Sequence, residues 1–326
     1  MSLDSDVIVD RRRIRRKLTF WRVVAALVAI AAIVTVGVIV TPGGRGAFTA
    51  SGSIARIQID GLIRSDNDRV EALERLEKSR AAAVIVHINS PGGTTAGSEQ
   101  LYDALVRLKA KKPVVVVVEG LAASGGYIAA IAADHIIAQQ SSLVGSIGVL
   151  FQFPNFTELL KTVGVKVEEV KSSPLKAAPN GFEPTSPEAR AALDALVKDS
   201  YAWFRDLVKA RRGMDDALLE QVADGRVFTG RQAVDLKLID QLGDEKTAIA
   251  WLVAQKNIKS DLPVRDFKLS PRFGDLTFLR TAASITLDAV GLGAIARQVE
   301  QGGVAQAVDR LGLDGMLALW SPAGAN

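Results

Sequence analysis

The chain has 326 residues, of which 40 are Lys or Arg, 36 are Asp or Glu, two are His and none is Cys. This length suits one large domain or two smaller ones, and the lack of Cys excludes a thiol nucleophile, a disulfide framework and thiolate metal sites. With only two histidines, we expect neither a metal site nor a cofactor, so catalysis must depend on Ser, Thr, Lys, Asp, Glu, Tyr and backbone groups.

The net charge of +4 comes entirely from the N-terminus. Residues 1–22 carry seven basic and three acidic side chains, whereas the remaining 304 residues carry 33 of each. A neutral body lacks the broad positive surface that binding of phosphate backbones needs. We therefore expect no nucleic-acid partner, and a nucleic-acid-binding tail at residues 11–17 is the alternative.

An uncharged apolar stretch at residues 23–40 follows the basic N-terminus. As a helix it would be roughly 27 Å long, close to the ~30 Å thickness of the hydrocarbon core of a membrane. Trp21 suits the interface at its start, and Thr41-Pro42-Gly43-Gly44 ends it. The pattern predicts a transmembrane signal anchor with a cytoplasmic N-terminus and an exported body. A cleaved signal peptide and a buried helix are the alternatives.

Beyond a linker at residues 41–52, the apolar pattern predicts strands that alternate with helices. We expect strands at 54–59, 83–88, 114–118 and 135–138, separated by helices at 69–80, 95–108 and 124–133. This alternation, every 25–30 residues, predicts an α/β fold with a mostly parallel sheet. The five consecutive valines at 114–118 suit a central strand that is buried on both faces.

The second half of the chain is less regular. We expect a strand at Val165–Val170, a long helix at Pro187–Arg212 and a short helix at Arg231–Lys237. The folded domain would then span residues 53–261, followed by a C-terminal tail at 262–326. Within the tail, residues 276–296 are apolar but are interrupted by two charges, which favours an amphipathic helix over a second membrane span.

Two glycine-rich loops follow expected strands, where open α/β sheets place their sites. The loop Asn89-Ser90-Pro91-Gly92-Gly93 would expose backbone N–H groups that can bind an oxyanion, and an ordinary turn is the alternative. Ser124 precedes Gly125 and Gly126 at the start of a helix. Its hydroxyl would be accessible as a nucleophile, and a simple N-cap is the alternative.

A nucleophilic serine needs a base, and neither histidine suits that role. His87 lies within an apolar strand and His135 begins another, so we interpret both as structural. A lysine that burial makes neutral can accept a proton near pH 7, as in Ser-Lys variants of the catalytic triad. Lys176 is flanked by Leu, Ala and Pro residues. A solvated loop lysine is the alternative, and the residues alone leave both open.

Four motifs together identify a family resemblance. They are NSPGG at 89–93, ASGGY at 123–127, KSSPLKAAP at 171–179 and GRVFTGRQAVDLKLIDQLG at 225–243. In order and spacing they resemble the short, single-unit form of the bacterial signal peptide peptidase A family, in the Clp-protease/crotonase superfamily. The resemblance covers roughly residues 53–255. It implies a serine peptidase domain over 53–261, built from repeated ββα units with a mostly parallel sheet.

The resemblance also implies roles for individual residues. Ser124 matches the nucleophile of the family, and Lys176 matches its general base. Gly93 and the N–H of Gly125 match the positions that form the oxyanion hole. Ser146 matches a serine that could orient the lysine amine. The chain departs from the family pattern in carrying Ser173, Ala177 and Ile128, and none of these differences removes a catalytic group.

The resemblance further implies a homo-oligomer in which the serine and lysine of one site come from adjacent protomers. Its substrates would be cleaved signal peptides or other apolar peptides. The protein would be a single-pass protein of the inner membrane, with its catalytic domain on the periplasmic side. The alternatives are a catalytically silent scaffold or peptide-binding module, and a crotonase-like acyl-CoA enzyme, which export would separate from its substrate.

Overall fold

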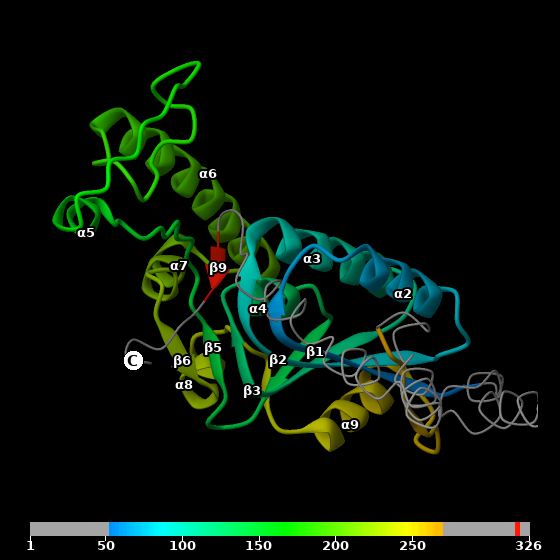
Figure 1. The fold of residues 1–326 in the computed structure, drawn as a ribbon. Helices are drawn as coiled ribbons and strands as arrows, with labels where there is room; N and C mark the ends of the chain where they lie inside the picture. The colour runs from blue at the N-terminus through cyan, green and yellow to red at the C-terminus, as the bar shows by residue number, and fades with distance from the viewer. Residues whose placement is uncertain (1–51, 270–316, 320–326) are drawn as a thin grey trace, which may run out of the picture. The chain divides into compact units, whose positions relative to one another are not determined.

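The computed structural model describes residues 52–269 and 317–319 (Figure 1). The expected basic N-terminus, the membrane segment and nearly all of the linker lie outside these residues, as does the expected amphipathic helix at 276–296. Within the described ranges, no helix combines the length and the apolar character that crossing a membrane requires.

A single mixed sheet forms the centre of the described domain. Its strands are β1 Ile54–Ile63, β2 Ala83–Thr94, β3 Val114–Ala123, β4 His135–Ala138, β5 Leu143–Gly145, β6 Val227–Thr229, β7 Gln241–Leu242, β8 Val264–Asp266 and β9 Leu317–Leu319. The order is β6-β5-β3-β2-β1-β8, with β4 between β3 and β7 and with β9 on β2. The pairings β2–β9 and β5–β6 are antiparallel, and the others are parallel. The predicted α/β fold with a mostly parallel sheet is therefore confirmed.

Helices cover both faces of this sheet. They are α2 Asn67–Glu77, α3 Thr95–Lys109, α4 Gly125–Ala130, α5 Thr157–Thr162, α6 Pro187–Arg212, α7 Asp216–Val222, α8 Gly230–Asp235 and α9 Glu245–Lys256. Figure 1 shows α2, α3 and α4 on one face and α9 on the other. Because side chains alternate along a strand, Val114 and Val116 join the core under α3, whereas Val115 and Val117 join the core under α9. The consecutive valines of β3 thus fill two cores at once.

Residues 150–186 project from the sheet as an arm, which carries α5 and continues into α6 (Figure 1). Of the twelve exposed large apolar side chains in the described residues, ten lie in this arm. The predicted strand at Val165–Val170 is wrong, because this stretch has no regular secondary structure. Val165, Val167 and Val170 are exposed, and no described strand lies beside them to complete a ladder.

Two stretches of the expected C-terminal tail belong to the sheet. β8 pairs in parallel with β1 through Ile54 and Val264, and so covers an edge that would otherwise be open. β9 pairs with the end of β2. The sheet therefore includes residues beyond 261, the expected end of the folded domain. These two strands were not predicted because three residues are too few to produce a recognisable alternation of apolar and polar side chains.

Candidate active site

Ser124 occupies the sharp turn between β3 and α4. Its φ of 54° and ψ of −116° form a conformation that residues with a side chain rarely adopt, at a cost of order 1–3 kcal/mol. The backbone N–H of Ser124 donates to the carbonyl of Gly145 at 2.8 Å, and its own carbonyl accepts from Tyr127 and Ile128. A strained strand-to-helix turn of this kind is typical of nucleophilic serines.

The side chain of Ser124 does not cap the helix that follows it. It accepts no capping hydrogen bond from α4, which removes the N-cap alternative. The hydroxyl is buried, and within the described part of the chain its one hydrogen bond is a long one, of 3.4 Å, to the carbonyl of Gly148. The Ser124 Oγ is thus held loosely and faces the chain segment that follows β5.

Hydrogen bonds to other parts of the domain hold the short helix α4 in place, both at its C-terminal end and through a side chain within it. The Arg211 guanidinium, from α6, donates to the carbonyls of Ile131 at 2.8 Å and Ala133 at 3.0 Å. The buried Tyr127 hydroxyl donates to the carbonyl of Leu238 at 2.8 Å, and burial raises the pKa of this phenol. Gly125 is the first residue of α4, so its N–H has no acceptor within the helix and is free to serve as an oxyanion donor.

The NSPGG loop lies at the same end of the sheet as Ser124. Ser90 pairs with Ala122, two residues before Ser124. The Ser90 hydroxyl donates to the carbonyl of Gly61 at 2.7 Å and accepts from the N–H of Gly92 at 3.1 Å. Because Ser90 already occupies the Gly92 N–H, Gly93 is the better oxyanion donor of the two glycines. The structure therefore brings together the turns that carry Ser124, Gly125 and Gly93, and it assigns Ser90 a positioning role that sequence analysis missed.

Ser146 follows β5 on the other side of β3. Gly145 pairs with Ala123, and Ser146 has a φ of 51° and donates its N–H to the carbonyl of Arg226 at 2.8 Å. It lines a cavity of about 360 Å³ together with apolar residues of the same segment and of α6, among them Ile147, Leu150 and Val197. Gly148, whose carbonyl accepts from the Ser124 hydroxyl, also lines this cavity. Most of the lining surface is apolar.

Lys176 lies in the arm and is exposed in the single chain, which corresponds to the alternative of a solvated loop lysine. Among the described residues its ammonium has no hydrogen-bond or ion-pair partner, so the single chain does not bring it to Ser124. Lys171, in the same loop, contacts Glu169 at 2.6 Å and Glu183 at 2.5 Å. These two carboxylates raise the pKa of Lys171 and so favour its charged form, which makes Lys171 a poor base.

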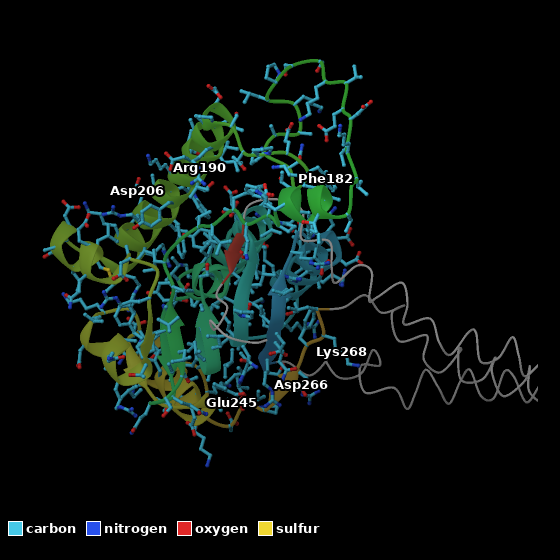
Figure 2. All side chains as sticks on the ribbon, turned by 60° about the vertical axis from the view of Figure 1, so that its left-hand side comes forward. Phe182, Arg190, Asp206, Glu245, Asp266 and Lys268 are labelled. Carbon is cyan, nitrogen blue, oxygen red and sulfur yellow. The ribbon has the colours of Figure 1, made fainter. Side chains whose placement is uncertain are left out.

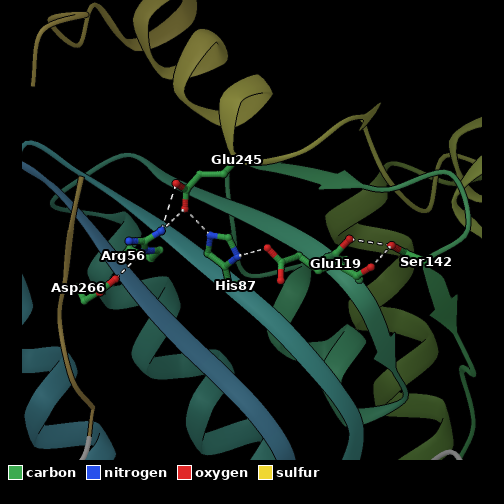
Figure 3. A network of polar contacts seen from close by, with 7 residues as sticks. Arg56, His87, Glu119, Ser142, Glu245 and Asp266 are labelled. Carbon is green, nitrogen blue, oxygen red and sulfur yellow. Dashed lines mark hydrogen bonds and ion pairs between the residues drawn. The ribbon is translucent and has the colours of Figure 1, made fainter. Parts of the chain in front are cut away.

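The two histidines contact groups other than Ser124. His87 Nδ1 lies 3.0 Å from Glu119 Oε1, and its Nε2 lies 2.7 Å from Glu245 Oε2 (Figure 3). His135 stacks on Trp251 with a centroid distance of 4.6 Å. These contacts agree with the structural interpretation of both residues.

The contacts of His87 belong to a network at the opposite end of the sheet from the arm. Arg56 links Glu245 to Asp266, and Figure 2 shows both carboxylates far from Phe182, which lies in the arm. The network joins β1, β2, β3 and β8 to the start of α9. We interpret it as an anchor for that helix.

We expect His87→Ala to lower the free energy of unfolding by about 2–4 kcal/mol, because it removes a buried ring that contacts the carboxylates of Glu119 and Glu245. Urea denaturation of the variant and the parent would measure this loss. The activity per folded molecule should stay at the parental level, since the network lies away from Ser124. An unchanged urea midpoint would contradict the anchoring role.

Comparison with known proteins places this chain in a family. The model of peptidase family S49 matches residues 106–259, and the Clp protease model matches residues 57–142. A Synechocystis protein that is provisionally named a protease is 37% identical over 210 residues, which are 64% of this chain and 76% of the relative. An Enterococcus faecium protein provisionally named signal peptide peptidase SppA is 31% identical, over 60% of this chain and 57% of its own.

A third relative extends the match to plants. The chloroplastic serine protease SPPA of Arabidopsis thaliana is 32% identical over 229 residues, which are 68% of this chain and 34% of the plant protein. The chain thus spans three quarters of one relative and smaller shares of the other two. From the S49 match and the extent of the Synechocystis alignment, we conclude that the chain belongs to peptidase family S49.

Proposed function

We propose that the protein is a serine endopeptidase in which Ser124 attacks the substrate carbonyl and Lys176 of an adjacent protomer accepts the hydroxyl proton. The observation that carries this proposal is the strained turn at Ser124, with its loosely bonded hydroxyl, at the same end of the sheet as the NSPGG loop. The oxyanion donors in this proposal are the N–H groups of Gly93 and Gly125. These two donors would stabilise the tetrahedral oxyanion, each by about 3–4 kcal/mol. The lysine would then pass the proton to the leaving amine, and water would hydrolyse the acyl-enzyme.

The arm supports the assignment of Lys176 to a neighbour's site. A lysine acts as a base only when it is neutral, and transfer from water to apolar surroundings favours the neutral amine. In the single chain Lys176 is exposed, on an arm that also exposes Phe151, Phe156 and Phe182. Packing of this apolar surface on a second copy of the chain would bury the lysine. The homo-oligomer would then be a requirement of catalysis, with Ser146 positioned to orient the amine.

We further propose that the substrates are cleaved signal peptides or other apolar peptides. The segment at residues 23–40 would anchor the protein at the membrane, where such peptides are found. The apolar cavity beside Ser146 supports this choice, as does the name of the Enterococcus relative. The exported, periplasmic position of the domain follows from the charge pattern around that segment. The Clp-protease/crotonase type of fold is part of the same proposal, supported by the Clp protease match over residues 57–142.

Subunit mixing would test the proposal. We expect chains with Ser124→Ala and chains with Lys176→Ala to be inactive alone and to regain about a quarter of the parental activity when co-assembled in equal amounts. Each site would take its serine from one chain and its lysine from the next across a head-to-tail interface, so random mixing leaves a quarter of the sites intact.

The readout would be hydrolysis of a fluorogenic apolar peptide, with covalent labelling of Ser124 by a fluorophosphonate as a second measurement. A mixture as inactive as its two components would contradict the shared site. Absence of both hydrolysis and labelling in the parent would instead favour the catalytically silent scaffold.

A further inference from the structure

The chain's own strand β9 lies on the edge of the sheet beside the NSPGG loop. It runs antiparallel to the end of β2, with Leu317 opposite Thr94, Ala318 opposite Gly93 and Leu319 opposite Gly92. On its other edge, this part of β2 pairs with Leu62 and Ile63 of β1. Because a strand has only two edges, β9 occupies the edge that β3 occupies earlier along β2.

The register shows which group of the candidate active site β9 faces. β3 pairs with β2 as far as Ser90 and Ala122, and then the chain turns away at Ser124 to begin α4. β9 takes the place in the sheet that β3 leaves, next to the end of β2. An extended peptide in this place runs past Ser124 and lies against Gly93, the expected oxyanion donor.

This position is built to accept a peptide backbone. Gly92 and Gly93 carry no side chains, and β3 pairs with β2 only as far as Ser90, so the main-chain groups of this edge beyond Ser90 can pair with another strand. A peptide that adds a strand to a sheet edge gains affinity from main-chain hydrogen bonds, which are independent of its sequence. The segment 316–320 reads Met-Leu-Ala-Leu-Trp and carries no charge, like the apolar peptides proposed as substrates.

We propose that the C-terminal segment around Leu317–Leu319 is a tethered peptide ligand of the catalytic groove, which must leave the Gly92–Thr94 edge before a substrate can bind there. The description of this edge as a substrate site rests on the proposed function, whereas the pairing itself does not. A tether of 47 residues, 270–316, joins β9 to the folded domain. A tether can give an effective concentration in the mM range, so a segment that binds with a Kd near 0.1 mM would weaken competing peptides by about ten-fold.

The test compares two substitutions in the full chain that carries Ser124→Ala, so that no peptide is cleaved. Ala318→Pro removes a backbone N–H and disfavours sheet pairing, whereas Ala318→Val keeps the N–H and suits a strand. The probe is a fluorescein-labelled synthetic peptide of residues 315–322, and fluorescence anisotropy measures its binding. We expect the probe to bind the Ala318→Pro chain about ten-fold more tightly than the Ala318→Val chain, which should match the chain without a substitution at 318.

A chain with both Ala318→Pro and Leu319→Pro is a second variant. Because the N–H groups of adjacent residues point to opposite edges of a strand, it removes whichever of the two faces β2, and it should tighten binding at least as much as Ala318→Pro. Equal probe affinities for the proline and valine chains would overturn the proposal. With Ser124 intact, Ala318→Pro should lower the KM for a fluorogenic peptide by the same factor and leave kcat unchanged.

The two readouts separate this inference from the proposed function. A shift in probe binding without any peptidase activity in the Ser124-intact chain would reject the enzyme and retain the tethered ligand. Peptidase activity without a shift in binding would reject the tethered ligand and retain the enzyme.

Discussion

Replacing Lys176 with Ala is expected to lower kcat by about 10⁴-fold or more, and Ser124→Ala should have an effect of the same size. When two residues act as one catalytic unit, removal of either costs about as much as removal of both. The residual rate acceleration then comes from the oxyanion hole and from substrate binding. Both variants should keep the parental circular dichroism and oligomer size, because neither side chain holds the fold: Lys176 is exposed and has no partner among the described residues, and Ser124 makes one long hydrogen bond.

Two further substitutions separate the role of a base from that of a positive charge. Lys176→Arg keeps the charge, but its guanidinium stays protonated and cannot accept a proton, so it should be as inactive as Lys176→Ala. Lys166→Ala removes an exposed lysine from the same arm and should retain parental kcat. Near-parental activity in Lys176→Arg would show that charge, rather than proton transfer, is what the site requires.

Gly93→Ala should both destabilise the domain and impair catalysis. The new Cβ would lie 1.8 Å from the carbonyl oxygen of Ile63, which belongs to the neighbouring strand. Because main-chain atoms on both sides are held by sheet pairing, relief requires the end of β2 to move. We expect a loss of about 3 kcal/mol or more in the free energy of unfolding. Displacement of the Gly93 N–H should lower kcat of the remaining folded enzyme by about 10²-fold or more.

Gly213→Ala is the matched control for this substitution. Gly213 ends α6 with a φ of 59°, and a Cβ there meets no atom within 4 Å. It should lose only the ~1–2 kcal/mol that the left-handed conformation costs, with kcat unchanged. Urea denaturation and peptide hydrolysis would measure both variants. Equal losses of stability at Gly93 and Gly213 would contradict the close approach of β1 and β2 at the NSPGG loop.

Much of the fold could be predicted from local patterns. The valines of β3 and the spaced apolar residues of α3 and α6 identify their elements, because a buried strand and an amphipathic helix need those side chains wherever they pack. The same reasoning failed at Val165–Val170. Its valines suit a strand, yet a strand forms only beside a partner, and the described residues supply none there. β8 and β9 were not predicted, for the opposite reason. Their own sequences do not indicate strands, but each lies beside a strand of the sheet with which it can pair.

The candidate site divides in the same way. The chemistry available can be read from the residues alone: no thiol, two histidines in structural positions, a serine between a valine strand and two glycines, and a lysine in an apolar loop. Which of these groups meet depends on tertiary contacts, because hydrogen bonding and sheet pairing join residues far apart in the chain. The tertiary structure placed Ser124 beside the NSPGG loop through the pairing of β2 and β3, paired Lys171 with two carboxylates, left Lys176 exposed on the arm, and laid residues 317–319 along the edge that ends at Gly93.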